Sequence, residues 1–337
     1  MYKDRHEERK IKEYLSELIR TNNYVIERQS DGSNLLRPKI MPEETLHFST
    51  AKMYDIPDDN TIIWRYMDYP KFEYLIKNKK LWMSNPDQFS QDKKEGILFE
   101  DFKRFINELL DIAYEQLKNS NITNLSGITF THNKYRDMLQ MKMRMQNVYD
   151  YCRKRFYISC WTGKDYESDS HWDRYTKDNN AIAIKTTVGN LKTSLKTYGL
   201  FTIAKVQYKN PEEKFFELKT EYMKILTGIW ALAGYMLTIK RHFFDADKEI
   251  RLMTDNIMEN RTTWEKLSCM HLLGDQDFDY NRKLEFEHMT IPIDLSILLG
   301  DIVLSPNSDM SFRKQVQNLL NENNLSNVPI YESEINK

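Results

Sequence analysis

The chain has 337 residues, of which 40% are hydrophobic and 12% aromatic, enough to bury a core and to exclude wholesale disorder. Its formal net charge of −1 gives no overall electrostatic case for nucleic-acid or membrane partners. The three cysteines show no metal-ligand spacing, and no signal peptide or membrane-spanning stretch is visible. We therefore expect a reduced, cytoplasmic protein with no metal site and no membrane partner.

The N-terminal segment differs in pattern from the rest of the chain. Residues 4–21 repeat apolar side chains at helical spacing, which predicts an N-terminal helical extension over residues 1–55. No linker or internal repeat divides residues 56–337, so these are expected to form a single α+β domain. Helical insertions are expected within it at about 97–155 and 212–239.

Strand and helix patterns alternate along this domain. Short runs of branched and aromatic residues predict strands at residues 61–67, 81–83, 156–161, 181–184, 201–208, 283–293 and 328–331. Apolar residues at helical spacing predict helices at 69–76, 167–175, 191–195 and 312–321. A further short helix and strand are expected within residues 295–304.

Polar and aromatic side chains concentrate in residues 156–187, where a predicted strand gives way to a helix. Ser168, His171, Trp172 and Tyr175 fall on one face of that helix. Functional sites in α/β-type folds are often built at such crossings. This stretch is therefore the first place to look for a site.

The same stretch resembles the pattern C-W-x(4–5)-E-S-x-x-M-W-x-x-Y…G-I-A-I-x-T-T of a prokaryotic domain-of-unknown-function family, number 2971. The matching residues are Cys160, Trp161, Glu167, Ser168, Trp172, Tyr175 and 181–187. His171 stands where methionine is usual, and Asn180 where glycine is usual. Residues 240–251 are similar to the family's K-R-x-x-F-x-x-E-x-E-x-R, with Asp247 as the first acid.

The order of polar residues is also similar to the R…S…E-x-E arrangement of ADP-ribosyltransferases. This resemblance implies an ADP-ribosyltransferase-like fold, an α+β protein with a mixed or antiparallel β core, and NAD as substrate. Arg65 would hold the NAD phosphates or ribose, Ser159 would position the nicotinamide ribose, and Glu249 would stabilise the oxocarbenium-like cation. Asp247 would orient or activate the acceptor, from the same side of an extended strand as Glu249. We expect Arg65, Ser159 and Glu249 to converge on one dinucleotide-sized cleft.

Aromatic residues complete the expected NAD site. Tyr66, Trp161, Trp172 and Tyr175 are expected to contribute to cofactor binding, the last three by stacking on nicotinamide, adenine or a target base. Tryptophans at helix–strand junctions are also common core anchors, so burial is the alternative for each of them.

The polar residues have structural alternatives too. Arg65 could be an ion-paired strand arginine, and Ser159 a tolerated small residue in a strand. The alternation of Asp247, Glu249 and Arg251 could equally form a solvated strand face with a local salt bridge.

These patterns lead to one main functional hypothesis and two rivals. The first is an enzyme that uses NAD to modify a macromolecular acceptor, protein or nucleic acid, as a bacterial toxin or anti-phage effector with a neutralising or activating partner. The second is a metal-dependent nuclease using Asp92, Glu95, Asp247 and Glu249. The third is a non-catalytic sensor that binds a ligand or phage protein through its aromatic groove and Met-rich helices.

Overall fold

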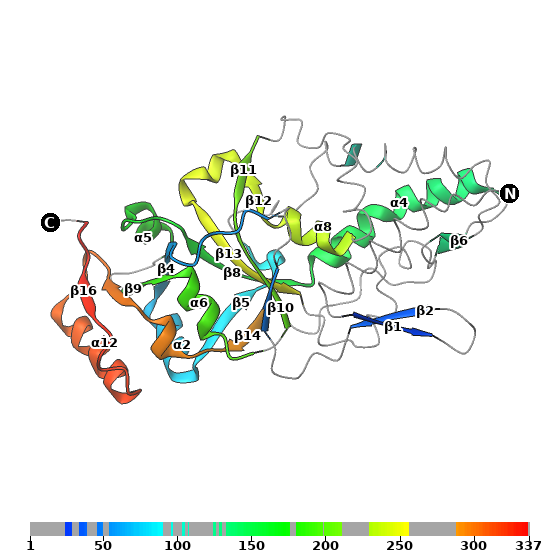
Figure 1. Cartoon of the computed structure of the whole chain (residues 1–337). Coiled ribbons are helices and arrows are strands. Elements are labelled where there is room, and N and C mark those ends of the chain that lie inside the picture. The colour runs from blue at the N-terminus through cyan, green and yellow to red at the C-terminus, as the bar shows by residue number, and fades with distance from the viewer. Residues whose placement is uncertain are drawn as a thin grey trace. The chain divides into compact units, whose positions relative to one another are not determined.

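The structure is a computed structural model, shown in Figure 1. It describes residues 24–28, 34–38, 46–49, 54–89, 96, 103–104, 107, 124–125, 128–129, 133–175, 180–197, 199–210, 229–255 and 288–335. Within these residues, none of the helices has the length and apolar character needed to cross a membrane. The chain divides into two units, Met1–His47 with Thr197–Gly199, and Phe48–Lys196 with Leu200–Lys337.

The first unit contains a pair of antiparallel strands. β1 (Tyr24–Arg28) pairs with β2 (Asn34–Pro38), with Ile26 opposite Leu36. A strand pair thus occupies part of the region for which a helical extension was predicted. The predicted helix at residues 4–21 lies outside the described residues.

Most of a ten-stranded sheet, counted over the described residues, belongs to the second unit. Its order is β16-β15-β9-β4-β8-β13-β10-β3, and β5 with its neighbour β14 branches from β8. The strands are β3 (Leu46–Phe48), β4 (Ile62–Asp68), β5 (Lys80–Ser84), β8 (Phe156–Thr162), β9 (Ala181–Thr187), β10 (Gly199–Lys205), β13 (Glu249–Asp255), β14 (His288–Pro292), β15 (Asp301–Leu304) and β16 (Ile330–Glu332). β15 and β16 pair in parallel, whereas β9, β4, β8 and β13 pair antiparallel.

Helices of varied length connect the strands (Figure 1). They are α2 (Tyr69–Asn78), α4 (Lys134–Arg153), α5 (Asp169–Tyr175), α6 (Val188–Ser194), α8 (Ile229–Met236), α11 (Leu295–Leu298) and α12 (Met310–Glu322). Short elements are β6 (Asn124–Leu125), β7 (Ile128–Thr129), β11 (Gln207–Lys209), β12 (Ile239–Arg241) and the 3-10 helices η1 (Pro86–Gln88) and η3 (His242–Asp247). Helices and a mixed, largely antiparallel sheet make this an α+β protein, as predicted.

Local chemistry explains α2, which joins β4 to β5. Pro70 stands in its first turn, where a missing backbone N–H costs nothing. The helix buries Phe72, Leu75 and Ile76 and ends at Asn78, and the following residue, Lys79, has a left-handed φ of 51°. The chain then reverses directly into β5.

The register of the sheet defines two faces. Glu249 lies opposite Thr162, which in turn lies opposite Trp64, so these three side chains point to the same side. Tyr66 and Cys160 join them because side chains alternate along a strand. We call this side the α5 face, because α5 packs against it.

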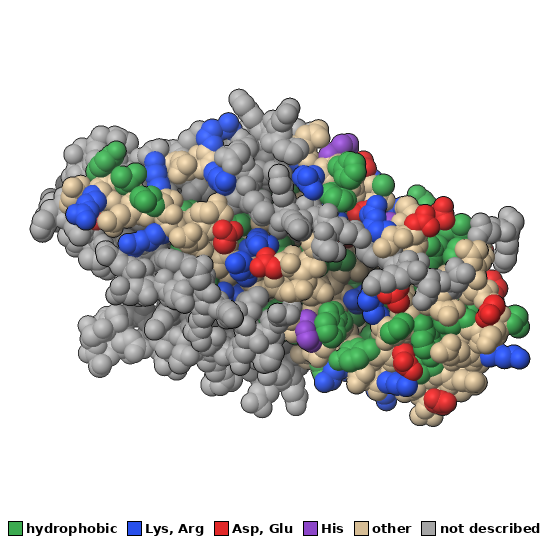
Figure 2. All heavy atoms as spheres, turned by 180° about the vertical axis from the view of Figure 1, so that it is seen from behind, with side chains coloured by type: hydrophobic (Ala, Val, Ile, Leu, Met, Phe, Trp, Pro, Cys, Tyr) green, Lys and Arg blue, Asp and Glu red, His purple; other side chains and the backbone are tan. Residues whose placement is uncertain are grey.

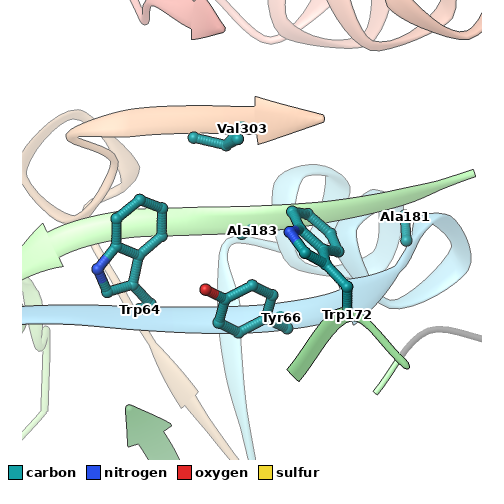
Figure 3. Packing of buried hydrophobic residues seen from close by; sticks show 6 residues of the cluster. All are labelled: Trp64, Tyr66, Trp172, Ala181, Ala183 and Val303. Carbon is teal, nitrogen blue, oxygen red and sulfur yellow. The ribbon is translucent and has the colours of Figure 1, made fainter. Parts of the chain in front are cut away.

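A buried aromatic cluster on the α5 face joins α5 to the sheet (Figure 3). The rings of Trp64 and Tyr66 stack along β4 with centroids 6.2 Å apart. Trp172 meets Tyr66 edge to face at 4.9 Å, and Ala183 on β9 lies beside them. Tyr66 also accepts a hydrogen bond from the Ser168 backbone N–H, at 2.9 Å, which fixes the start of α5.

Candidate functional site

A row of five alternating charges lies on the α5 face. Arg174 contacts Asp247, and Asp247 lies 3.3 Å from the ammonium of Lys240. The same ammonium is 3.0 Å from Glu249, whose other oxygen is 2.8 Å from Nε of Arg251. We call these five side chains the charge chain. It carries three positive and two negative charges.

The charge chain runs from the interior of the protein to its surface. Arg251 is fully buried and also donates to the Leu237 carbonyl oxygen. Glu249 and Lys240 are buried as well, whereas the Arg174 side chain is 31% exposed. Buried charges are tolerated when each is paired, which is the arrangement here. Of the five side chains, that of Arg174 is the most exposed.

The two acids reach the charge chain from different local structures. Asp247 ends the 3-10 helix η3, and Lys248 then turns the backbone with a left-handed φ of 45° before Glu249 begins β13. The prediction that both carboxylates lie on one extended strand is therefore wrong. They still meet, because Lys240 on β12 bridges them.

Glu249 is held in its charged form. Burial alone raises the pKa of its carboxyl, but Arg251 and Lys240 outweigh burial and lower the pKa to about 2. A side-chain hydrogen bond with Cys160 acts in the same direction. Such a carboxylate can stabilise a developing cation, but it cannot donate a proton near neutral pH.

Three cations gather at the exposed end of the charge chain. The backbone N–H of Gly163 donates to the Lys248 carbonyl oxygen at 2.7 Å, which brings Lys164 next to Lys248. Burial lowers the pKa of the Lys164 ammonium, nearby Asp247 raises it, and Lys248 and Arg174 lower it. Lys164, Lys248 and Arg174 thus form a local group of positive charge, which suits an anion such as a phosphate.

Beneath this cationic group lies a hydrogen-bonded set of side chains at the start of α5. The hydroxyl of Ser168 lies 2.8 Å from Nδ1 of His171 and accepts a hydrogen bond from Lys164 at 3.1 Å. Burial, and secondly Lys164, lowers the pKa of the His171 imidazole to about 4. His171 is therefore neutral at neutral pH.

The depressed pKa of His171 predicts a loss of stability in mild acid. Between pH 6.5 and about 4 the His171 imidazole is protonated in the unfolded chain but not in the folded protein. The free energy of unfolding therefore decreases as pH falls. The free energy of unfolding should drop by up to about 3 kcal/mol across this window. Urea titrations at several pH values should show this drop in the wild type and a smaller one in His171→Phe. His242→Phe, at an exposed histidine, is the matched control and should keep the wild-type slope.

Arg65 and Ser159 do not share a face with Glu249. Both lie at alternate positions to the α5-face residues of β4 and β8, and so does Trp161. The Arg65 guanidinium sits 5.6 Å from the Trp161 ring centre, and Trp161 donates to the Ser159 hydroxyl at 3.1 Å. Burial lowers the pKa of Arg65 to about 10. Contrary to the prediction, Arg65, Ser159 and Glu249 therefore do not converge on one cleft.

Three of the four aromatic residues expected to bind the cofactor lie in the core. Trp161, Trp172 and Tyr66 are at most 7% exposed, so the alternative of core anchors holds for them. The side chain of Tyr175 lies outside the described residues.

Sequence reasoning left out part of this site. It named Asp247 and Glu249. Its alternative was a solvated strand face of Asp247, Glu249 and Arg251 with a local salt bridge: the structure has such a bridge between Glu249 and Arg251, but both side chains are buried, so the solvated face is wrong. Arg174 and Lys164 were not identified. Their signal was their position in the motif segment, four residues or fewer from Ser168 or His171.

The nuclease hypothesis depends on acids that the structure does not describe. Asp92 and Glu95 lie outside the described residues. Among the described ones, no group of three His, Cys, Asp or Glu side chains is arranged to hold a metal ion. Asp247 and Glu249 contact cationic side chains instead.

Comparison with known proteins finds no matching family model, no matching curated protein and no matching solved structure. The resemblance to family 2971 therefore stays a prediction from the motif residues.

Proposed function

We propose that the protein is an NAD-dependent ADP-ribosyltransferase whose reacting site lies at the charge chain on the α5 face. One observation carries this proposal: Glu249 is ion-paired with Lys240 and Arg251, while Arg174 lies at the exposed end of the same charge chain, where Gly163 brings Lys164 next to Lys248. With this function we also propose that the α+β fold is ADP-ribosyltransferase-like. A toxin or anti-phage effector acting on a macromolecular acceptor would use this chemistry.

The reaction requires a group that stabilises the developing cation and groups that bind the pyrophosphate. The glycosidic bond to nicotinamide breaks, nicotinamide leaves with the bonding electron pair, and the ribose becomes an oxocarbenium-like cation that an ionised carboxylate stabilises. The acceptor then bonds to the same ribose carbon and releases a proton to a base or to water. Glu249 suits the first role, and Arg174 with Lys164 suits the pyrophosphate.

Arg174 gives the test of NAD binding. Arg174→Gln should weaken NAD binding by at least about tenfold, because it removes a charge-assisted contact to phosphate. Isothermal titration calorimetry with NAD measures this directly. Arg313→Gln is the matched control, because Arg313 is also ion-paired and similarly exposed, at 34%, but lies on α12. If Arg65→Gln abolished binding while Arg174→Gln did not, the NAD site would lie on the opposite face and this proposal would be wrong.

A non-catalytic ligand sensor is the second candidate. This candidate is favoured because each carboxylate oxygen of Asp247 and of Glu249 already contacts a cationic side chain. A sensor would bind NAD or another phosphate ligand without releasing nicotinamide. It would also keep its biological effect after Asp247→Asn and Glu249→Gln are combined.

A further inference from the structure

An exposed group of stacked rings lies away from the charge chain, on β5, β14 and α2. Trp82 is 39% exposed and stacks on His288, with ring centres 3.7 Å apart and planes 11° from parallel. Tyr74, 36% exposed, meets Trp82 edge to face at 6.0 Å. We call these three side chains the ring platform. Trp82 and Tyr74 therefore present partly exposed rings in a fixed arrangement at the surface.

The sheet holds the ring platform in a fixed geometry. β5 alternates exposed and buried residues, so Lys80 and Trp82 point to solvent while Leu81 and Met83 are buried. β14 pairs with β5 in a register that sets His288 diagonal to Trp82. In addition, Arg65 donates a hydrogen bond to the Trp82 carbonyl oxygen at 3.1 Å, which anchors the backbone below the ring.

A basic turn borders the ring platform. Residues 77–80 are all exposed and join α2 to β5. Lys77 is already paired with Glu73 at 2.7 Å, so Lys79 and Lys80 supply the positive charge. Lys80 lies two residues before Trp82 on the same side of β5. Positive charge therefore lies within one side chain's reach of the stacked rings.

We propose that the ring platform and its basic turn bind single-stranded nucleic acid. Bases stack on aromatic side chains whatever their sequence, and lysines beside the rings contact the phosphates. A purely apolar protein partner would need a broad hydrophobic patch. Here the exposed Lys79 and Lys80 adjoin the rings instead. Figure 2 shows one face of the molecule, on which basic, acidic and hydrophobic side chains all occur over the described part.

This inference is independent of the proposed NAD chemistry. It uses none of the residues of the charge chain, and its test is binding rather than turnover. The net charge of −1 excludes only a global electrostatic attraction, and leaves room for a local site of this kind.

Fluorescence anisotropy with labelled 12-nucleotide oligo-dT and oligo-U tests the proposal on the full chain. Trp82→Ala should weaken binding of the preferred oligonucleotide by about tenfold or more, because base stacking on an aromatic ring is lost. Trp82→Phe keeps an aromatic face and should lose much less. The double variant Lys79→Gln, Lys80→Gln should lower the slope of log affinity against log salt by about 1.4, since each phosphate contact to a single strand contributes about 0.7.

Tyr331→Ala is the matched control, because Tyr331 is an exposed aromatic residue on β16, outside the ring platform. Binding of one or both oligonucleotides that depends on Trp82 and on salt, but not on Tyr331, supports the proposal and identifies DNA or RNA as the source. No binding by the wild type overturns it, and so does binding that Trp82→Ala leaves unchanged. Loss of NAD cleavage leaves these results unaffected, so the two proposals fail separately.

Discussion

Replacing Glu249 by glutamine is expected to lower the rate of nicotinamide release from NAD by at least about a hundredfold. Glutamine keeps the size of the side chain and its hydrogen-bonding capacity but removes the charge that would stabilise the oxocarbenium-like cation. Loss of one preorganised electrostatic group costs about 10²–10³ in rate in well-studied enzymes. Liquid chromatography of released nicotinamide, at saturating NAD, measures the effect.

Asp247→Asn is the comparison that separates chemistry from folding. It makes the same carboxylate-to-amide change in the same charge chain and contacts the same Lys240. It should slow transfer to the acceptor more than hydrolysis of NAD, whereas Glu249→Gln should slow both. Circular-dichroism melts of both variants verify that they are folded at the assay temperature. Wild-type NAD cleavage by folded Glu249→Gln would refute the assignment of Glu249.

The local elements could be read from the sequence because their signals are local. Short runs of branched and aromatic residues predicted β4 and β8, and apolar residues at helical spacing predicted α2. These features act within ten residues. The structure has each of these elements where it was predicted, with ends that differ by a few residues.

The sequence did not predict in the same way which side chains share a face of the sheet. Whether Ser159 and Glu249 point to the same side depends on the register between β8 and β13, which pairs Glu249 with Thr162. A shift of one residue would have paired it with Trp161 or Gly163 and put Ser159 on its side. The order of Arg, Ser and Glu along a chain contains no information about register.

Ion pairs between residues far apart in the sequence could not be predicted, for a related reason. A local salt bridge among Asp247, Glu249 and Arg251 was an alternative from the sequence, and the Glu249–Arg251 pair is two residues apart. Arg174 and Asp247, in contrast, are 73 residues apart. The exposure of tryptophans was not decided by the sequence either: Trp161 and Trp172, for which both ligand stacking and burial were considered, are buried, whereas Trp82, for which no prediction was made, is 39% exposed. Burial depends on which elements pack together, and a single tryptophan gives no sign of this.

Replacing Arg251 by methionine is expected to lower the free energy of unfolding by about 3–5 kcal/mol. Within the described part of the chain, the substitution leaves the buried Glu249 with Lys240 as its remaining ion-pair partner, and it removes a donor from the Leu237 carbonyl oxygen. Breaking a buried pair by removing one member costs this much because the other charge stays out of water. Urea unfolding followed by circular dichroism gives the value.

Arg313→Met tests whether the cost comes from burial rather than from the loss of any ion pair. The Arg313–Glu332 pair is partly exposed, so its removal should cost about 0–1 kcal/mol. A second comparison removes both members of the buried pair. Because Glu249→Leu with Arg251→Met leaves no unpaired charge from that pair, the double variant should be more stable than the sum of the single changes by about 0.5–3 kcal/mol. Strict additivity would mean that the two side chains do not stabilise each other, and that Lys240 alone holds Glu249 in its charged form.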